Sequence, residues 1–208
     1  MKRAAIRSKR QRGSKQELAL AQARRVGAFR PRDLAVPRSY LARWLRKGLI
    51  ERVSRGLYSA SGADISENHA TVEACKRVPH GVICLISALR MHNLGTQIPH
   101  QVWLAIDRTA RNPRIDYPPI RIVRMSGAAR TAGIEQHVFE GVAVRVYSPA
   151  KTIADCFKFR NKIGLDVALE ALRDFWISRG RNIDDLWRFA SICRVANVMR
   201  PYLEMLAV

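Results

Sequence analysis

The sequence predicts an α+β protein in two parts: a small helical unit that ends in a β-hairpin, and a larger part with a sheet and C-terminal helices. Three observations predict this fold class. The 208 residues are 48% hydrophobic, which suffices for a buried core. Apolar residues recur at helical spacing near both ends of the chain, and short strand-like runs separated by turns lie between them. The hydrophobic fraction of 48%, together with a net charge of +20, excludes a disordered acidic chain and a collagen-like one.

Positive charge is concentrated near the N-terminus. The net charge is +20, and residues 1–60 hold 17 Lys and Arg against three acids, whereas the other 148 residues hold 20 basic and 14 acidic side chains. Such an asymmetry predicts a polyanionic partner for the N-terminal part. Charge alone does not distinguish a nucleic-acid partner from an anionic membrane surface, or either of them from basic side chains that only keep the protein in solution.

The first 13 residues are predicted to form a basic flexible arm, followed by domains at 14–60 and 64–208. Residues 1–13 contain six Lys or Arg, no acid and almost no large apolar side chain, so they cannot bury enough surface to fold alone. We expect the arm to contact nucleic-acid phosphates through Arg7, Lys9, Arg10 and Arg12.

Three helices are expected within residues 14–60. Ser14 and Glu17 have the spacing of a capping box, which predicts a first helix over Lys15–Val26. A short second helix is expected around Arg32–Ala35. The third is expected over Pro37–Lys47, with the proline as its first residue, where its missing N–H costs nothing.

The third helix is predicted to have an apolar face and a basic face. An advance of about 100° per residue places Leu41, Trp44 and Leu45 on one face, together with Pro37 and Gly48. The opposite face carries Ser39, Arg43 and Arg46, flanked by Ala42 and Lys47. We therefore expect one face to enter the core and the other to remain available for hydrogen bonding.

A basic β-hairpin is expected directly after the third helix. Two apolar runs, Leu49–Val53 and Leu57–Ser59, flank a turn that contains Gly56. Three helices followed by a basic hairpin is the order of a winged helix-turn-helix, whose third helix enters the DNA major groove. A small helical domain with a solvated basic face is the alternative. Fold order, charge and helix face together favour DNA binding.

The chemistry of the side chains assigns their roles on double-stranded DNA. Arg43 and Arg46 offer bidentate forks to guanine, and Ser39 can reach a base edge or a phosphate. The residues expected to contact the DNA backbone are Arg38, Lys47, Arg52, Ser54 and Arg55. RNA is less favoured, because the segment lacks the exposed aromatic pair used by readers of single strands.

The second part is predicted to combine a small antiparallel sheet with a helical cap. Its expected elements, in chain order, are a helix ending near Arg77, an apolar run at Val82–Ile86, a helical turn at Ser87–His92, strands at Gln101–Asp107 and Ile120–Met125, a hairpin of Gln136–Phe139 with Val142–Tyr147, and helices from Pro149 onward.

No enzyme, metal site or cofactor is predicted. The chain lacks a Gly-rich phosphate loop, a Ser nucleophile elbow and an Asp–x–Asp pair for two metals. Its five histidines and four cysteines lack ligand spacing, and the cysteines are expected to be reduced core thiols. The basic segments Arg108–Arg114 and Arg121–Arg130 are expected to be solvated loops or a second polyanion-binding or partner surface. Without an apolar span or a secretory signal, we expect a cytoplasmic protein.

Three stretches of the chain, in this order, resemble the AbiEi-type antitoxins of bacterial type IV toxin–antitoxin systems. They are Leu41-x-x-x-Leu45-x-x-Gly48-Leu49-Ile50-x-x-Val53-x-Arg55-Gly56-Leu57-Tyr58, then Ile86-Ser87-Ala88-Leu89-x-x-His92-x-Leu94, and finally Val146-x-Ser148-Pro149-Ala150-Lys151-Thr152-Ile153-x-Asp155. Asp155 belongs to the shared motif, but it also suits a polar position early in a helix, so we assign it no chemistry.

The resemblance implies a bacterial cytoplasmic protein that represses its own operon by binding inverted repeats through the winged domain. It also implies that the second domain counteracts a nucleotidyltransferase toxin without requiring a stable complex. Two alternatives stay open. One is a stand-alone winged-helix repressor without a toxin, and the other is a basic interaction protein that binds RNA or the toxin itself.

Overall fold

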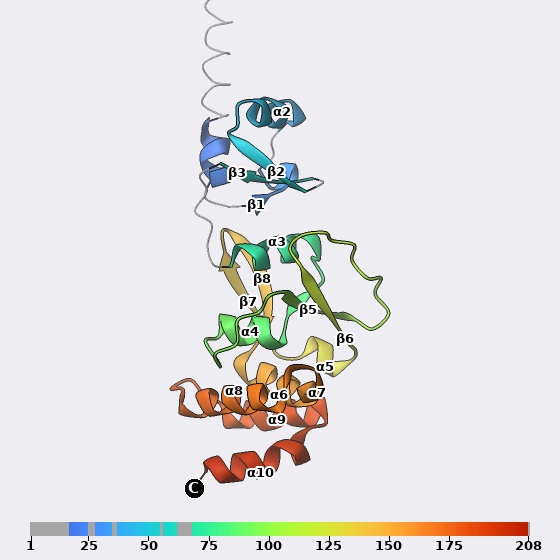
Figure 1. The fold of residues 1–208 in the computed structure, drawn as a ribbon, viewed down its shortest axis with the longest axis vertical. Helices are drawn as coiled ribbons and strands as arrows, with labels where there is room; N and C mark the ends of the chain where they lie inside the picture. The colour runs from blue at the N-terminus through green and yellow to red at the C-terminus, as the bar shows by residue number, and fades with distance from the viewer. Residues whose placement is uncertain (1–16, 25–27, 35–36, 55, 62–67, 208) are drawn as a thin grey trace, which may run out of the picture. The chain divides into compact units, whose positions relative to one another are not determined.

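The structure, a computed structural model, describes residues 17–24, 28–34, 37–54, 56–61 and 68–207 (Figure 1). The chain divides into two compact units. One comprises Met1–Glu73 with Val138–Val142, and the other comprises Ala74–His137 with Ala143–Val208. The described residues combine helices with two sheets, which confirms the α+β class.

The described residues before position 61 fold around a three-stranded antiparallel sheet. Residues 17–24 are helical, and the expected helix ends at Lys15 and Val26 lie outside the described residues. The elements that follow are β1 (Ala28–Phe29), the 3-10 helix η1 (Pro31–Leu34), α2 (Arg38–Arg46), β2 (Ile50–Ser54) and β3 (Leu57–Ala60). The sheet order is β1-β3-β2. The helices and the hairpin were predicted, but β1 was not.

The small core of this segment confirms the apolar face of α2 only in part. Its buried residues are Ala23, Phe29, Leu34, Leu41, Trp44, Ile50 and Ala60. Leu45 was expected on the core face, but it is 37% exposed, so α2 buries a narrower stripe than predicted. Pro37 precedes α2 as its N-cap instead of being its first residue, because its ψ of 142° is extended.

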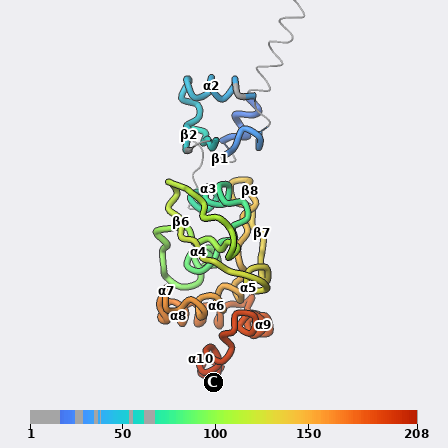
Figure 2. The backbone as a smooth tube through the Cα atoms, turned by 90° about the vertical axis from the view of Figure 1, so that its right-hand side faces the viewer, coloured from blue at the N-terminus to red at the C-terminus, as the bar shows by residue number. Residues whose placement is uncertain are grey.

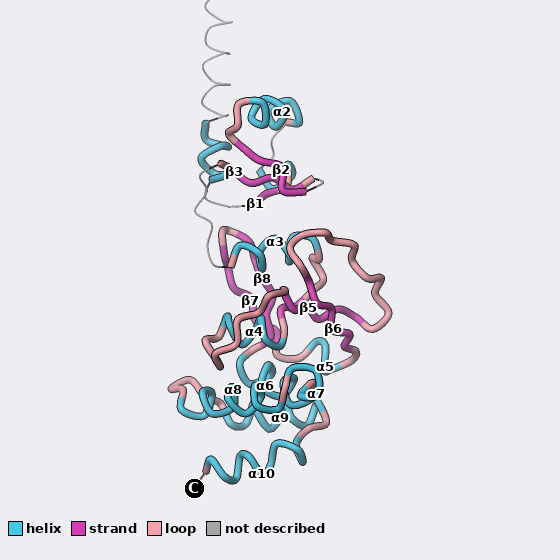
Figure 3. Tube along the Cα trace, in the orientation of Figure 1, coloured by secondary structure: helices cyan, strands magenta, loops and turns pink. Residues whose placement is uncertain are grey.

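Residues 68–207, the described part of the rest of the chain, contain five strands and several helices (Figure 3). The strands are β4 (Val82–Ile83), β5 (Val102–Asp107), β6 (Ile120–Met125), β7 (Ile134–Phe139) and β8 (Val142–Tyr147). The helices are α3 (His69–Arg77), α4 (Leu85–Met91), α5 (Ala128–Thr131), α6 (Pro149–Lys158), α7 (Arg160–Ile163), α8 (Leu165–Ile177), α9 (Ile183–Cys193) and α10 (Ala196–Leu206). Helix α4 begins within the apolar run expected at Val82–Ile86, which shortens the strand there to two residues.

The larger sheet is mixed, so the prediction of a small antiparallel sheet was wrong. Its order is β6-β5-β4-β8-β7. Strand β4 runs antiparallel to β5, but β4 runs parallel to β8 and β5 runs parallel to β6. Parallel neighbours need a crossover of about a dozen residues, which residues 108–119 supply between β5 and β6. Strand patterning does not reveal that such a long loop returns the chain to the same end of the sheet.

A layer of helices covers the core of the larger unit (Figure 2). Helix α6 lies at its centre and packs against α4, α8 and α9, while α10 packs against α8 and α9. Its residues from Ala150 to Phe157 are all buried. The C-terminal helical region predicted from the sequence is therefore confirmed, and α6 is its most enclosed element.

Candidate nucleic-acid interface

Helix α2 keeps its basic face in solvent and its apolar face in the core. Leu41 and Trp44 are only 4% and 3% exposed. Ser39, Arg43 and Arg46, which were predicted to lie on the opposite face, are all exposed. The helix contains no acidic residue, so its guanidinium groups have no carboxylate partner within the same helix. The structure therefore brings the three predicted base-reading residues together on one accessible surface.

A tight turn fixes α2 relative to the hairpin. Gly48 adopts a φ of 63°, the left-handed conformation that commonly ends a helix. The Leu49 N–H donates to the Trp44 carbonyl at 2.9 Å, and the Ser61 hydroxyl donates to the Gly48 carbonyl at 2.7 Å. Because backbone groups on both sides of the turn are bonded, the orientation of α2 is coupled to the sheet.

The hairpin that follows α2 in the sequence carries a further exposed basic residue. Arg52 on β2 is exposed, and its register partner is Tyr58 on β3. The register shifts between Arg52 and Ser54, and Gly56 has a φ of 77° in the turn. This irregularity, followed by a glycine in the left-handed conformation, increases the local twist of the two strands at the hairpin tip.

Several of the residues predicted to contact the DNA backbone lie partly or wholly outside the described residues. Lys47 is exposed and caps the C-terminus of α2. Arg38 begins α2 and Ser54 ends β2, but their side chains are not among those described. All of Arg55 lies outside the described residues, as do the arm positions Arg7, Lys9, Arg10 and Arg12.

Two exposed arginines in the elements before α2 were missed by the sequence reasoning. Arg24 lies in the first helical segment, and Arg32 lies in η1 with its side chain 73% exposed. The Arg32 Nε lies 3.9 Å from an Asp33 carboxylate oxygen, and most of the Arg32 side chain remains in solvent. A helical projection of residues 17–24 could have revealed Arg24, whereas the short 3-10 helix η1 offers no such periodicity for Arg32.

The cysteine thiols of the described chain are buried, and its metal-ligating side chains are not gathered into one group. Within those residues no group of three or more His, Cys, Asp or Glu could hold a metal ion. The four cysteines are buried and form no disulfide, as predicted. Burial raises the pKa of Cys75 and Cys193 to about 12, so both thiols stay protonated at neutral pH and are poor nucleophiles.

The fold and this surface define an α+β protein with an exposed basic helix supported by a three-stranded antiparallel sheet. Residues 16–60 match a family model described as "Transcriptional regulator, AbiEi antitoxin". The resemblance to AbiEi antitoxins is thus confirmed over this segment, about a fifth of the chain. No curated protein matches the chain. None of the helices in the described ranges is long and apolar enough to cross a membrane.

Proposed function

We propose that this chain is a DNA-binding transcriptional regulator that represses its own operon and acts as the antitoxin of a nucleotidyltransferase toxin. The observation that carries the proposal is the division of α2 into a buried apolar face and an exposed basic one, inside the segment that matches an antitoxin regulator family. We propose a winged helix-turn-helix over residues 14–60 with α2 as its recognition helix. The arm would be 1–13 and the antitoxin domain 64–208.

The proposed recognition uses two kinds of contact. Arg43 and Arg46 lie three residues apart on one helix face, so both guanidinium groups can enter the same stretch of major groove. Ser39, near the start of α2, contacts a base edge or a phosphate. The other contacts are made to phosphates by Arg38, Lys47, Arg52, Ser54, Arg55 and the basic arm. An operator of inverted repeats would be bound by two copies of the chain.

The antitoxin part of the proposal rests on the family match. The domain at 64–208 is proposed to counteract the toxin in the bacterial cytoplasm, without a stable complex being necessary. Co-expression with a nucleotidyltransferase encoded next to this chain should restore bacterial growth. A chain with Arg43→Ala and Arg46→Ala should restore growth equally, because neither residue lies in the antitoxin domain. Growth arrest despite co-expression would contradict the antitoxin function and leave a stand-alone repressor.

The DNA-binding function is tested by measuring binding to the chain's own upstream DNA and to scrambled DNA at two salt concentrations. We expect the preference for upstream DNA to survive at the higher salt, because base contacts depend less on counterion release than phosphate contacts do. Equal and steeply salt-dependent binding to both DNAs would overturn the proposed base readout. RNA binding in preference to either DNA would favour an interaction protein instead.

A further inference from the structure

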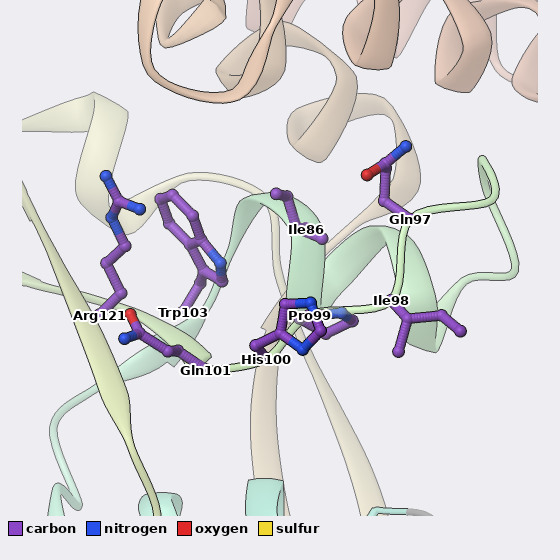
Figure 4. A pocket seen from close by; sticks show the side chains of 8 residues that line it. All are labelled: Ile86, Gln97, Ile98, Pro99, His100, Gln101, Trp103 and Arg121. Carbon is purple, nitrogen blue, oxygen red and sulfur yellow. The ribbon is translucent and has the colours of Figure 1, made fainter.

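A cavity of about 360 Å³ opens on the second unit, far in sequence from the basic helix (Figure 4). This volume lies within the range of small-molecule sites, which is usually about 300–1,000 Å³. Helix α4, strands β5 and β6 and the segment 97–101 surround it. Its lining residues are Ile86, Gln97, Ile98, Pro99, His100, Gln101, Trp103 and Arg121.

The lining combines an apolar wall with groups that both donate and accept hydrogen bonds. Ile86 and Pro99 are partly buried, and Trp103 is buried beside them. Gln97, His100 and Gln101 are exposed and come from one loop. Side-chain amides and an imidazole match the donor and acceptor edge of a heterocyclic ring better than they match an aliphatic chain.

Arg121 supplies a positioned positive charge to the lining of this cavity. Its guanidinium carbon lies 4.4 Å from the centroid of the Trp103 ring, and the two residues are register partners in β6 and β5. Stacking uses the face of the guanidinium and leaves its N–H groups at the edge available. No Asp or Glu lines the cavity, so an anionic group of a ligand would meet no repulsion from the lining.

Residues 101–103, which include two lining residues, are held in place by hydrogen bonds of the protein itself. The buried Ser87 hydroxyl accepts a hydrogen bond from the Trp103 N–H at 2.9 Å and donates to the Gln101 carbonyl at 3.4 Å. The Val102 N–H donates to the Pro119 carbonyl at 2.9 Å. A site that is already ordered loses less conformational entropy when a ligand binds.

We propose that this cavity binds a nucleoside monophosphate. The phosphate would accept hydrogen bonds from the edge of the Arg121 guanidinium, in the bidentate geometry that arginine favours. The base would lie against Ile86 and Pro99, and the loop residues Gln97 and Gln101 would contact its polar edge. This site is independent of the proposed DNA contacts, because none of its residues belongs to the first sixty.

Isothermal titration calorimetry of the full chain with AMP, GMP, CMP, UMP and inorganic phosphate tests the proposal. We expect saturable one-site binding of at least one nucleotide and weaker binding of inorganic phosphate. Charge-assisted hydrogen bonds contribute enough that Arg121→Gln should raise the Kd about tenfold or more. The matched control Arg111→Gln removes an equally exposed charge outside the cavity and should change the Kd less than about twofold.

A second variant keeps the test independent of charge. Ile86→Phe adds volume inside the cavity, so it should abolish nucleotide binding while the thermal unfolding transition stays cooperative. Absence of saturable binding by all four nucleotides would overturn the proposal. Binding of inorganic phosphate as tight as that of any nucleotide would overturn the assignment of the base. An equal effect of Arg121→Gln and Arg111→Gln would show general charge attraction and would also overturn it.

Discussion

Helices α2 and α6 both carry basic side chains, but they place them in opposite environments. Arg43 and Arg46 on α2 are exposed. Lys151 and Asp155 on α6 form an ion pair in which both side chains are 0% exposed. The comparison shows that the same kind of charge faces solvent on α2 and is enclosed by the packing of the fold on α6.

The buried pair on α6 is enclosed by further polar contacts. The Cys193 thiol, which comes from α9, donates to the second Asp155 oxygen at 3.3 Å. The Lys151 ammonium lies 4.2 Å from the centroid of the Tyr147 ring. The Tyr147 hydroxyl donates to the Arg130 carbonyl at 2.8 Å. Because Lys151 and Asp155 compensate each other in this enclosed site, removing either one alone leaves an uncompensated buried charge.

The largest effect is expected from breaking this pair. Lys151→Met should lower the free energy of unfolding by about 3–5 kcal/mol, because Asp155 would remain buried without its cation. Chemical denaturation measures this loss. The matched control is Lys158→Met, at the exposed end of the same helix, which should change stability by less than about 0.5 kcal/mol. Lys151→Met combined with Asp155→Leu should recover most of the loss, and failure to do so would contradict a purely electrostatic cause.

The converse effect is expected on α2, where charge should influence binding and leave folding unchanged. Arg43→Ala or Arg46→Ala should cost about 1–3 kcal/mol in binding to the operator and should relax its sequence preference. The same variants should change the free energy of unfolding by less than about 0.5 kcal/mol. Fluorescence anisotropy with operator and scrambled DNA measures the first effect, and chemical denaturation the second.

Two further variants separate base contacts of α2 from phosphate contacts and from a general effect of charge. Arg52→Ala should weaken binding to both DNAs similarly, because a phosphate contact carries no base information. The matched control is Arg200→Ala, an exposed arginine on α10, which should leave both affinities unchanged. If Arg43→Ala and Arg46→Ala weaken both DNAs equally, α2 is not the recognition helix.

A smaller, pH-dependent effect is expected from a partly buried histidine. Burial lowers the pKa of His92 below its ordinary 6.5, and its Nε2–H donates to the Tyr147 carbonyl at 2.7 Å. The unfolded chain therefore takes up a proton before the folded chain does. The stabilising contribution is complete above about pH 6.5 and is lost as the pH falls toward the lower folded pKa, with a slope of at most about 1.4 kcal/mol per pH unit.

Denaturation at a series of pH values checks this contribution. His92→Gln should flatten the decline in stability between about pH 6.5 and pH 5, where an ordinary histidine titrates. The exposed His80 provides the matched control, and His80→Gln should leave the pH profile unchanged. A profile that both variants alter alike would mean that His92 is not the source of the pH dependence.

The smallest effect is expected from an ion pair at the surface. Arg188 and Asp185 on α9 approach to 2.6 Å, but their side chains are 61% and 38% exposed. Arg188→Ala should therefore lower the free energy of unfolding by less than about 1 kcal/mol, because solvent screens exposed pairs. Thermal or chemical denaturation measures the change. A loss as large as that of Lys151→Met would remove the contrast between exposed and buried charge.

Features with a local signal could be predicted from the sequence. Strand β6 covers Ile120–Met125 as expected, and the hairpin of β2 and β3 forms around Gly56. Strand β1 could not be predicted, because its two residues have no periodicity and form a strand only by pairing with Ser59 and Tyr58 of β3. The accessible face of α2 was predictable from helical spacing, whereas the exposure of Arg32 depends on how η1 packs.

By itself, the sequence determined where positive charge accumulates, where elements with a local signal such as β6 and the β2–β3 hairpin form, and that the basic face of α2 stays outside the core. These properties follow from composition and from spacing along the chain. Only the tertiary structure decided the strand directions of the mixed sheet, the enclosure of Lys151 and Asp155 by α9, and the cavity beside Arg121. The physical reason is that periodicity acts over a few neighbouring residues, whereas burial and cavities depend on which distant segments meet.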